Sequence, residues 1–99
     1  MKVAEAYGAG KFGLSFELFP PKTPAGDEEL FKNVAELIQL KPAYITCTYG
    51  AGGSTRNKTL DVITRVREMS GLSVASHLTC VGSTVDQLRA YLAEAAARG

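Results

Sequence analysis

Segments typical of strands and segments typical of helices alternate strictly along this chain, and this alternation restricts the possible folds more than any other feature. Runs rich in β-branched and aromatic residues cover residues 13–19, 43–48 and 72–77, and the third run extends toward residue 80. Each run precedes a longer segment with apolar residues at helical spacing. A βαβαβα order predicts parallel strands joined by right-handed crossover helices. We therefore expect an α/β fold with a parallel sheet.

Capping and turn residues delimit the three helical segments. The expected N-caps are, in chain order, Asp27, Ser54 or Thr55, and Thr84 with Gln87 in a capping box. The expected C-terminal ends are Lys41-Pro42, Gly71 and Gly99. The side chains expected to face the core are Leu30, Phe31, Val34, Leu37 and Ile38 in the first segment, Leu60, Ile63, Val66 and Met69 in the second, and Leu88, Tyr91, Leu92, Ala95 and Ala96 in the third.

Parallel strands place their carboxyl ends at one rim, and this rim is where α/β proteins bind ligands. Residues 17–19, 48–53 and 77–80 should therefore lie together. A complete (β/α)8 barrel takes about 250 residues, so three βα units correspond to the first part of such a barrel. We expect residues 1–12 to form an N-terminal tail and residues 13–99 to form a partial TIM-barrel domain that ends before a fourth strand.

Charge and composition exclude several classes of protein. Eleven basic and ten acidic residues give a net charge of +1, which leaves no electrostatic footprint for nucleic acid or an anionic membrane. No apolar run approaches the ~20 residues that span a bilayer, and residues 1–13 contain no apolar stretch of a signal peptide. Two cysteines without a CxxC spacing predict reduced thiols rather than a disulfide framework. We expect a cytoplasmic protein.

The clearest candidate for chemistry is Glu17, which lies between Phe16 and Leu18 in an otherwise apolar strand. Strand alternation puts Ser15, Glu17 and Phe19 on one face, which in a barrel is the interior close to the mouth. Glutamate is almost never fully buried unless it is paired. Two interpretations stay open: a general acid, or a structural carboxylate paired with a lysine or arginine.

The remaining candidates follow the second and third strands. Residues 50–55 (GAGGST) join a strand to a helix and would suit an anion through their N–H groups, but they match neither a Walker A loop nor GxGxxG, so a plain turn is the alternative. Tyr49 would stack on an aromatic ligand or cover the rim. His77 stands at a strand end, where it would bind a ligand or a neighbouring carbonyl. His77, Cys47 and Cys80 lack the spacing of a zinc site, so we expect no metal and two buried thiols.

Three motifs taken together resemble a known family. Residues 15–23 (SFELFPPKT), 48–56 (TYGAGGSTR) and 77–81 (HLTCV) are similar to the first strand, the second strand-to-helix loop and the third strand end of methylenetetrahydrofolate reductases. The motifs occur in the family's order and on the expected elements. The resemblance covers nearly all of the chain from about residue 13 onward, and it corresponds to the first part of the family's catalytic domain.

The resemblance implies a flavin-dependent (β/α)8 barrel that uses FAD and either NADH or NADPH to reduce 5,10-methylenetetrahydrofolate to 5-methyltetrahydrofolate in one-carbon and methionine metabolism. It implies that a hydride passes from the nicotinamide to the flavin and then to the folate. Glu17 matches the family's proton donor, which opens the folate bridge to an iminium. The resemblance also implies that Thr48, Tyr49 and Ala51 contact the flavin or the nicotinamide, and that His77 contacts the flavin.

The sequence departs from the family's pattern in one respect. The fourth-strand Arg-Gly-Asp segment, which contributes an aspartate near the flavin and the folate, has no counterpart here. Two interpretations therefore stay open beside the reductase: a non-catalytic fragment or degenerate paralogue, and a small α/β module that binds a phosphate ligand through residues 50–55. The expected partner is the folate substrate, without nucleic acid or a membrane, and formation of a homo-oligomer is left open.

Overall fold

The computed structural model describes residues 2–49 and 56–99 of the chain. In this part of the chain, strands β1 (Ser15–Leu18), β2 (Tyr44–Cys47) and β3 (Ser73–Ser76) form a parallel sheet in the order β1-β2-β3. The strands are followed in turn by α1 (Pro24–Ile38), α2 (Arg56–Ser70) and α3 (Val85–Ala97), and a 3-10 helix, η1 (Val3–Ala6), precedes β1. The predicted parallel βαβαβα arrangement, which resembles the first three units of a (β/α)8 barrel, is confirmed.

The strands are shorter than the sequence patterns predict, because only four residues of each run pair fully with a neighbour. Single hydrogen bonds nevertheless extend the sheet at its carboxyl end. The Thr48 N–H donates to the Leu18 carbonyl at 3.0 Å, and the His77 N–H donates to the Cys47 carbonyl at 2.9 Å. The residues just beyond β2 and β3 are thereby held in line with the strands.

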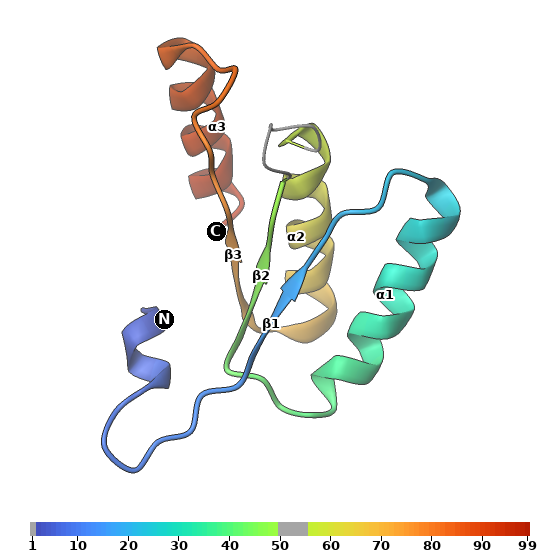
Figure 1. Cartoon of the computed structure of the whole chain (residues 1–99), viewed down its shortest axis with the longest axis vertical. Coiled ribbons are helices and arrows are strands. Elements are labelled where there is room, and N and C mark those ends of the chain that lie inside the picture. Colours follow the sequence, from blue (N-terminus) through green and yellow to red (C-terminus); the bar gives the residue numbers. More distant parts are fainter. Residues whose placement is uncertain (1, 50–55) are drawn as a thin grey trace.

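One face of the sheet carries the hydrophobic core. Leu18, Ile45 and Cys47 from the strands are buried against Val34 of α1 and Val66 of α2. Figure 1 shows α1 and α2 together on the right of the strands, whereas η1 lies on the left. Because successive strand residues point to opposite faces, the core leaves a second set of side chains on the other face. We call this second face the open face and define it by Ser15, Glu17, Tyr44, Thr46, Ser73 and Ala75.

The N-terminal segment contacts the open face at the amino end of the strands. The hydroxyl groups of Tyr7 and Tyr44 lie 2.8 Å apart, and the two rings meet edge to face with 6.3 Å between their centroids. The prediction that residues 1–12 form a separate tail is not tested by this contact and stays a prediction.

The first helix begins at a different cap from the one that the sequence suggests. Thr23 caps α1, since its Oγ1 accepts a hydrogen bond from the Gly26 N–H at 3.1 Å. The prediction of Asp27 as the cap is wrong, because Pro24 is well suited to the first helical position and moves the start of the helix upstream. Asp27 lies instead within the first turn.

The start of α3 and the end of α2 follow the sequence, whereas α1 ends at Ile38, before the predicted Lys41-Pro42. The capping box of Thr84 and Gln87 at the start of α3 is confirmed. Gly71 follows α2 with a φ of 67°, a left-handed conformation that glycine adopts without steric cost. The predicted caps Ser54 and Thr55 lie outside the described residues.

The predicted apolar face of α1 packs on the core, but three predictions for the other helices are wrong. Met69, in the last turn of α2, is 40% exposed, Leu92 of α3 is 55% exposed, and Ala96 of α3 is exposed as well. Leu92 lies about 100° around the helix from Tyr91, which is the residue that faces the sheet, so its side chain points away. Val62 is buried instead. None of the helices within residues 2–49 and 56–99 has the length and hydrophobicity of a bilayer-spanning segment.

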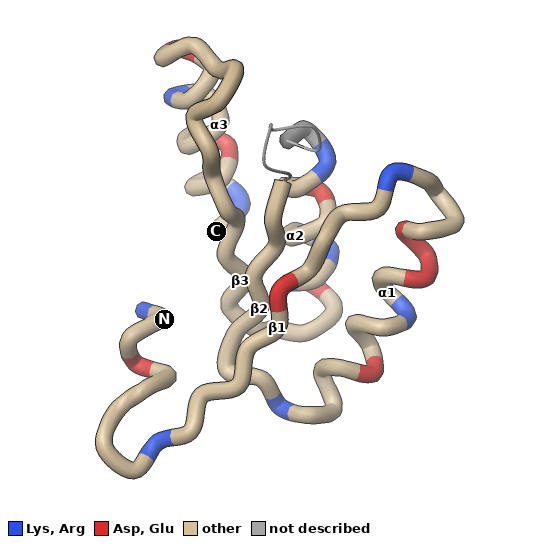
Figure 2. The backbone as a smooth tube through the Cα atoms, viewed as in Figure 1, with Lys and Arg blue, Asp and Glu red and all other residues tan. Residues whose placement is uncertain are grey.

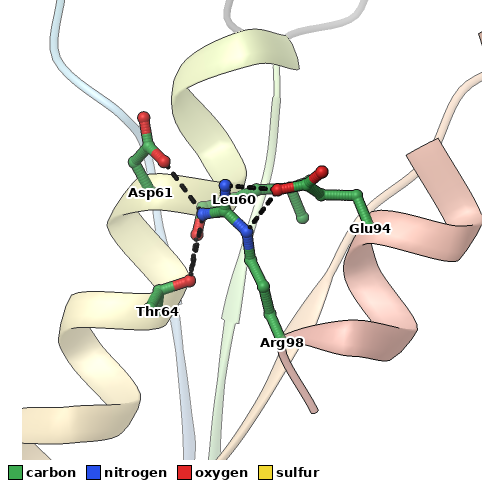
Figure 3. A network of polar contacts seen from close by, with 5 residues as sticks. All are labelled: Leu60, Asp61, Thr64, Glu94 and Arg98. Carbon is green, nitrogen blue, oxygen red and sulfur yellow. Dashed lines mark hydrogen bonds and ion pairs between the residues drawn. The ribbon is translucent and has the colours of Figure 1, made fainter. Parts of the chain in front are cut away.

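The end of α3 is fixed to α2 by a polar network around Arg98. Figure 3 shows its guanidinium group between the two helices, with 2.9 Å from Nη1 to Asp61 Oδ1 and 2.6 Å from Nη2 to Glu94 Oε1. Arg98 also donates a hydrogen bond to Thr64 Oγ1 at 3.2 Å. The third βα unit is therefore held to the second by side chains as well as by the sheet.

Candidate active site

Glu17 of β1 and His77, which follows β3, meet on the open face. The Nδ1 atom of His77 lies 3.5 Å from the Oε1 atom of Glu17. The side chain of Glu17 is 47% exposed and that of His77 is 46% exposed, so both groups keep contact with solvent. Figure 2 shows the acidic position of β1 on strands that are otherwise uncharged. Two candidates from distant parts of the sequence thus form one cluster.

The contact between these two side chains crosses the middle strand. The register aligns Glu17 with Thr46 and Thr46 with Ala75. Neighbouring strands lie about 4.8 Å apart, so the backbones of β1 and β3 are separated by roughly 10 Å. Both side chains must therefore lean over β2 to reach each other.

The partner of Glu17 decides what the cluster can do. Among residues 2–49 and 56–99, the ion pair of Glu17 is with an imidazole and not with a lysine or arginine. A histidine can both accept and donate a proton near neutral pH, and a carboxyl group can do the same in the acidic range. The pair is therefore suited to holding and passing a proton, which a purely structural lysine or arginine partner would not do.

Thr48 lies at the carboxyl end of β2, between the strands that carry Glu17 and His77. Its N–H is bonded to the Leu18 carbonyl, and its own carbonyl accepts a hydrogen bond from Thr59 Oγ1 at 3.3 Å. Strand alternation directs the Thr48 side chain to the same side as Glu17. Hydrogen bonds to its N–H and to its carbonyl thus both hold the Thr48 backbone in place.

The ring of Tyr49 lies on the core side of the sheet. It is 2% exposed, and it stacks on Tyr91 of α3 with 5.9 Å between centroids and 27° between planes. Its hydroxyl donates to the Thr79 carbonyl and accepts from the Thr79 N–H. The structure does not bring this ring to the open face with Glu17 and His77. The prediction of a cofactor contact at Tyr49 stays a prediction.

Ala51 and the rest of the glycine-rich segment, residues 50–55, lie outside the described residues. The predicted cofactor contact at Ala51 and the predicted anion site on this segment are therefore untested.

The two cysteines differ in their surroundings. Cys47 is buried, and burial raises the pKa of its thiol to about 12, with the negative charge of Glu17 acting in the same direction. This thiol stays protonated at neutral pH and is unsuited to nucleophilic or metal chemistry. Cys80 is exposed, so the prediction of a buried thiol is wrong there, because the chain has left the sheet by this point. Groups of three metal-ligating side chains are absent from the described part of the chain.

The sequence pattern does not single out Lys58, which contacts the loop between β1 and α1 that follows Glu17. The Lys58 ammonium group, near the start of α2, donates a hydrogen bond to the carbonyl of Pro21 in the loop between β1 and α1. A lysine near a helix terminus carries no local signal of such a role, because its partner lies far away in the sequence. The order β1-β2-β3 and the packing of α1 beside α2 bring the two together.

The chain matches the sequence model of a protein family described as methylenetetrahydrofolate reductase, over residues 2–99. It is 41% identical over 80 residues to the 5,10-methylenetetrahydrofolate reductase of Salmonella typhimurium and 39% identical over 80 residues to the protein of the same name in Escherichia coli. Both alignments cover 81% of this chain and 27% of the relative.

A plant relative gives a similar result. Methylenetetrahydrofolate reductase (NADH) 1 of Zea mays is 39% identical over 87 residues, which are 88% of this chain and 15% of the plant protein. The chain thus spans about a quarter of the length of the bacterial relatives that it matches, and a smaller share of the plant one.

Proposed function

The chain belongs to the methylenetetrahydrofolate reductase family, and from this membership we propose that it supplies the proton-donating part of an enzyme that reduces 5,10-methylenetetrahydrofolate to 5-methyltetrahydrofolate. The proposed cofactor is FAD, and the proposed hydride donor is NADH or NADPH. The names of the relatives support an oxidoreductase of this kind. Because the chain spans about a quarter of the bacterial relatives' length, the activity is proposed for the whole protein.

One observation carries the proposal, namely the contact of 3.5 Å between His77 Nδ1 and Glu17 Oε1 on the open face. A general acid needs a titratable group that the substrate can reach and that can be protonated again after each turnover. Glu17 meets the first requirement because it is half exposed, and the adjacent imidazole supports the second. The glutamate that the sequence singles out therefore has a chemical setting that suits acid catalysis.

The residues of the open face fit a flavin. His77 offers a half-exposed imidazole and Thr48 offers a hydroxyl group, both at the carboxyl end of the strands, where parallel α/β sheets bind ligands. In the proposal, Thr48 and His77 hold the FAD, and Tyr49 and Ala51 remain proposed contacts. When bound, the cofactor supplies the hydride.

Glu17 is the proposed proton donor to the folate. Its protonated carboxyl group gives a proton to one nitrogen of the methylene bridge. The bond between that nitrogen and the bridging carbon breaks, and its electron pair stays on the nitrogen. The carbon becomes an iminium attached to the second nitrogen and is ready to accept a hydride. Glu17 ends the step as a carboxylate beside His77.

The proposal is tested in a full-length enzyme made by joining this chain to the remaining sequence of the Escherichia coli relative. We expect the purified protein to contain flavin and to oxidise NADH or NADPH over repeated turnovers only when methylenetetrahydrofolate is present. The unaltered Escherichia coli protein serves as the control. A folded, flavin-containing protein that oxidises the nicotinamide but never reduces the folate would contradict the proposal.

A further inference from the structure

We propose that His77 is a positioning residue for Glu17. His77 holds the carboxyl group of Glu17 over β2 and returns a proton to it after each turnover. This inference rests on the proposed function, because it concerns the proton that Glu17 donates to the folate. The family resemblance links His77 only with the flavin. The contact between Nδ1 and Oε1 gives the same side chain a second task.

The first part of the inference is orientation. The backbone of His77 is fixed, since its N–H donates to the Cys47 carbonyl at 2.9 Å and its carbonyl accepts from Ser76 Oγ at 3.1 Å. The imidazole then has only two side-chain torsions left. A glutamate side chain at a half-exposed site samples several rotamers, and a contact with a fixed imidazole restricts it to those that lean over β2. His77 thus sets where the Glu17 proton is presented.

The second part is the return of the proton. After donation, Glu17 is a carboxylate 3.5 Å from Nδ1 of His77. When the two atoms close to hydrogen-bond distance, the protonated imidazole gives its Nδ1 proton to Oε1 and becomes neutral, and it then takes a new proton from water at its exposed side. One proton moves in each step, and no bond to carbon forms or breaks. Solvent is the ultimate source of the proton.

Neighbouring titratable groups are poorly placed for this task. Cys47 projects to the core face, and its buried thiol keeps its proton because its pKa is raised to about 12. Tyr44 is on the open face, but it lies at the amino end of the strands, and its hydroxyl is engaged with that of Tyr7 at 2.8 Å. Within residues 2–49 and 56–99, the recorded ion-pair partner of Glu17 is His77.

The kinetic test compares His77→Ala and His77→Asn with Cys80→Ser, an exposed control three positions away, in the full-length enzyme. Rapid mixing at saturating FAD separates reduction of the flavin by the nicotinamide from its reoxidation by methylenetetrahydrofolate. Because His77 is also a proposed flavin contact, both half-reactions are compared in the FAD-loaded variant, and we expect His77→Ala to slow reoxidation about tenfold more than it slows reduction. Asparagine keeps a nitrogen near the place of Nδ1 but carries no exchangeable charge, so His77→Asn should recover part of the loss. Equal slowing of both half-reactions, or reoxidation within twofold of the parent, would overturn the inference.

A second measurement separates the inference from the proposed function. In the flavin-free full-length enzyme labelled with 15N at histidine, the signals of His77 are those that disappear in His77→Asn. We expect Glu17→Gln to shift these imidazole signals and Cys80→Ser to leave them in place. Unchanged signals in Glu17→Gln would show that the two side chains do not interact. If the signals shift but Glu17→Gln reoxidises normally, the proposed function fails, and the contact is structural only.

Discussion

Lys58 near the start of α2 pairs with Asp27 in the first turn of α1, with 2.7 Å between Lys58 Nζ and Asp27 Oδ1. The same ammonium group donates a hydrogen bond to the carbonyl of Pro21, in the loop that follows β1. Both charged side chains are about one third exposed, so the contact is partly shielded from water. The Lys58 ammonium group thus connects α2 both to α1 and to the loop that follows β1.

Removing this cation should lower stability. Lys58→Met keeps the length of the side chain but loses the ion pair and the hydrogen bond. We expect a loss of about 1 kcal/mol, which for a protein of a few hundred residues lowers the melting temperature by about 2–4 °C. The measurement is thermal unfolding of the full-length enzyme, with Lys58→Arg as the charge-retaining control. The effects of Lys58→Met and Asp27→Asn should be less than additive in the double variant, whereas simple additivity would contradict the ion pair.

The start of α1 gives a second prediction. Thr23 Oγ1 accepts a hydrogen bond from the Gly26 N–H at 3.1 Å, and loss of an N-cap of this kind costs about 1 kcal/mol. Thr23→Ala should therefore destabilise the full-length enzyme by about that amount in urea unfolding, while Thr23→Ser should stay within about 0.5 kcal/mol of the parent. In the Lys58→Met background, which lacks the ion pair, Asp27→Ala should lower the free energy of unfolding by less than Thr23→Ala does. Equal stability of Thr23→Ala and Thr23→Ser would contradict the assignment of the cap.

These helix starts show how far the sequence determines the fold. The alternation of strands and helices follows from local periodicity, and the box of Thr84 and Gln87 is a local signal, so both can be predicted without a structure. The choice between Thr23 and Asp27 is harder, because both residues are good caps and the following proline decides between them. The exposure of Leu92 depends on which side of α3 meets the sheet, and this is not a local property.

The candidate site, like the fold, can be predicted from the sequence only where the signal is local. An acidic residue in an apolar strand stands out in the sequence, so Glu17 can be found there. Its partner cannot, because the contact with His77 exists only when β3 lies next to β2 with Ala75 aligned to Thr46. The side of the sheet to which Tyr49 belongs follows from its parity with Cys47, but its stacking on Tyr91 requires the position of α3.

The buried thiol predicts a change of stability with pH. The pKa of Cys47 is raised from 9.0 to about 12, so between these values the unfolded chain releases a proton that the folded chain keeps. The unfolded state then binds fewer protons, and the free energy of unfolding falls as the pH rises from about 9 to 12, by at most about 1.4 kcal/mol per pH unit. Below pH 9 this group has no effect. Cys47→Ala should remove this part of the slope in urea unfolding curves recorded from pH 8 to 11, although it lowers overall stability. If the free energy of unfolding has the same pH dependence in Cys47→Ala and in the parent, the Cys47 thiol is not its source.

The most direct test of the account concerns the proton that Glu17 gives to the folate. In the full-length enzyme, Glu17→Gln keeps the size of the side chain and removes its acidic proton, and Glu28→Gln on the exposed part of α1 is the matched control. Reduction of the bound flavin by the nicotinamide and its reoxidation by methylenetetrahydrofolate are followed separately by rapid mixing. We predict that Glu17→Gln reduces its flavin within twofold of the parent rate but reoxidises it at least about a hundredfold more slowly. Reoxidation of Glu17→Gln at the rate of Glu28→Gln would contradict the central claim.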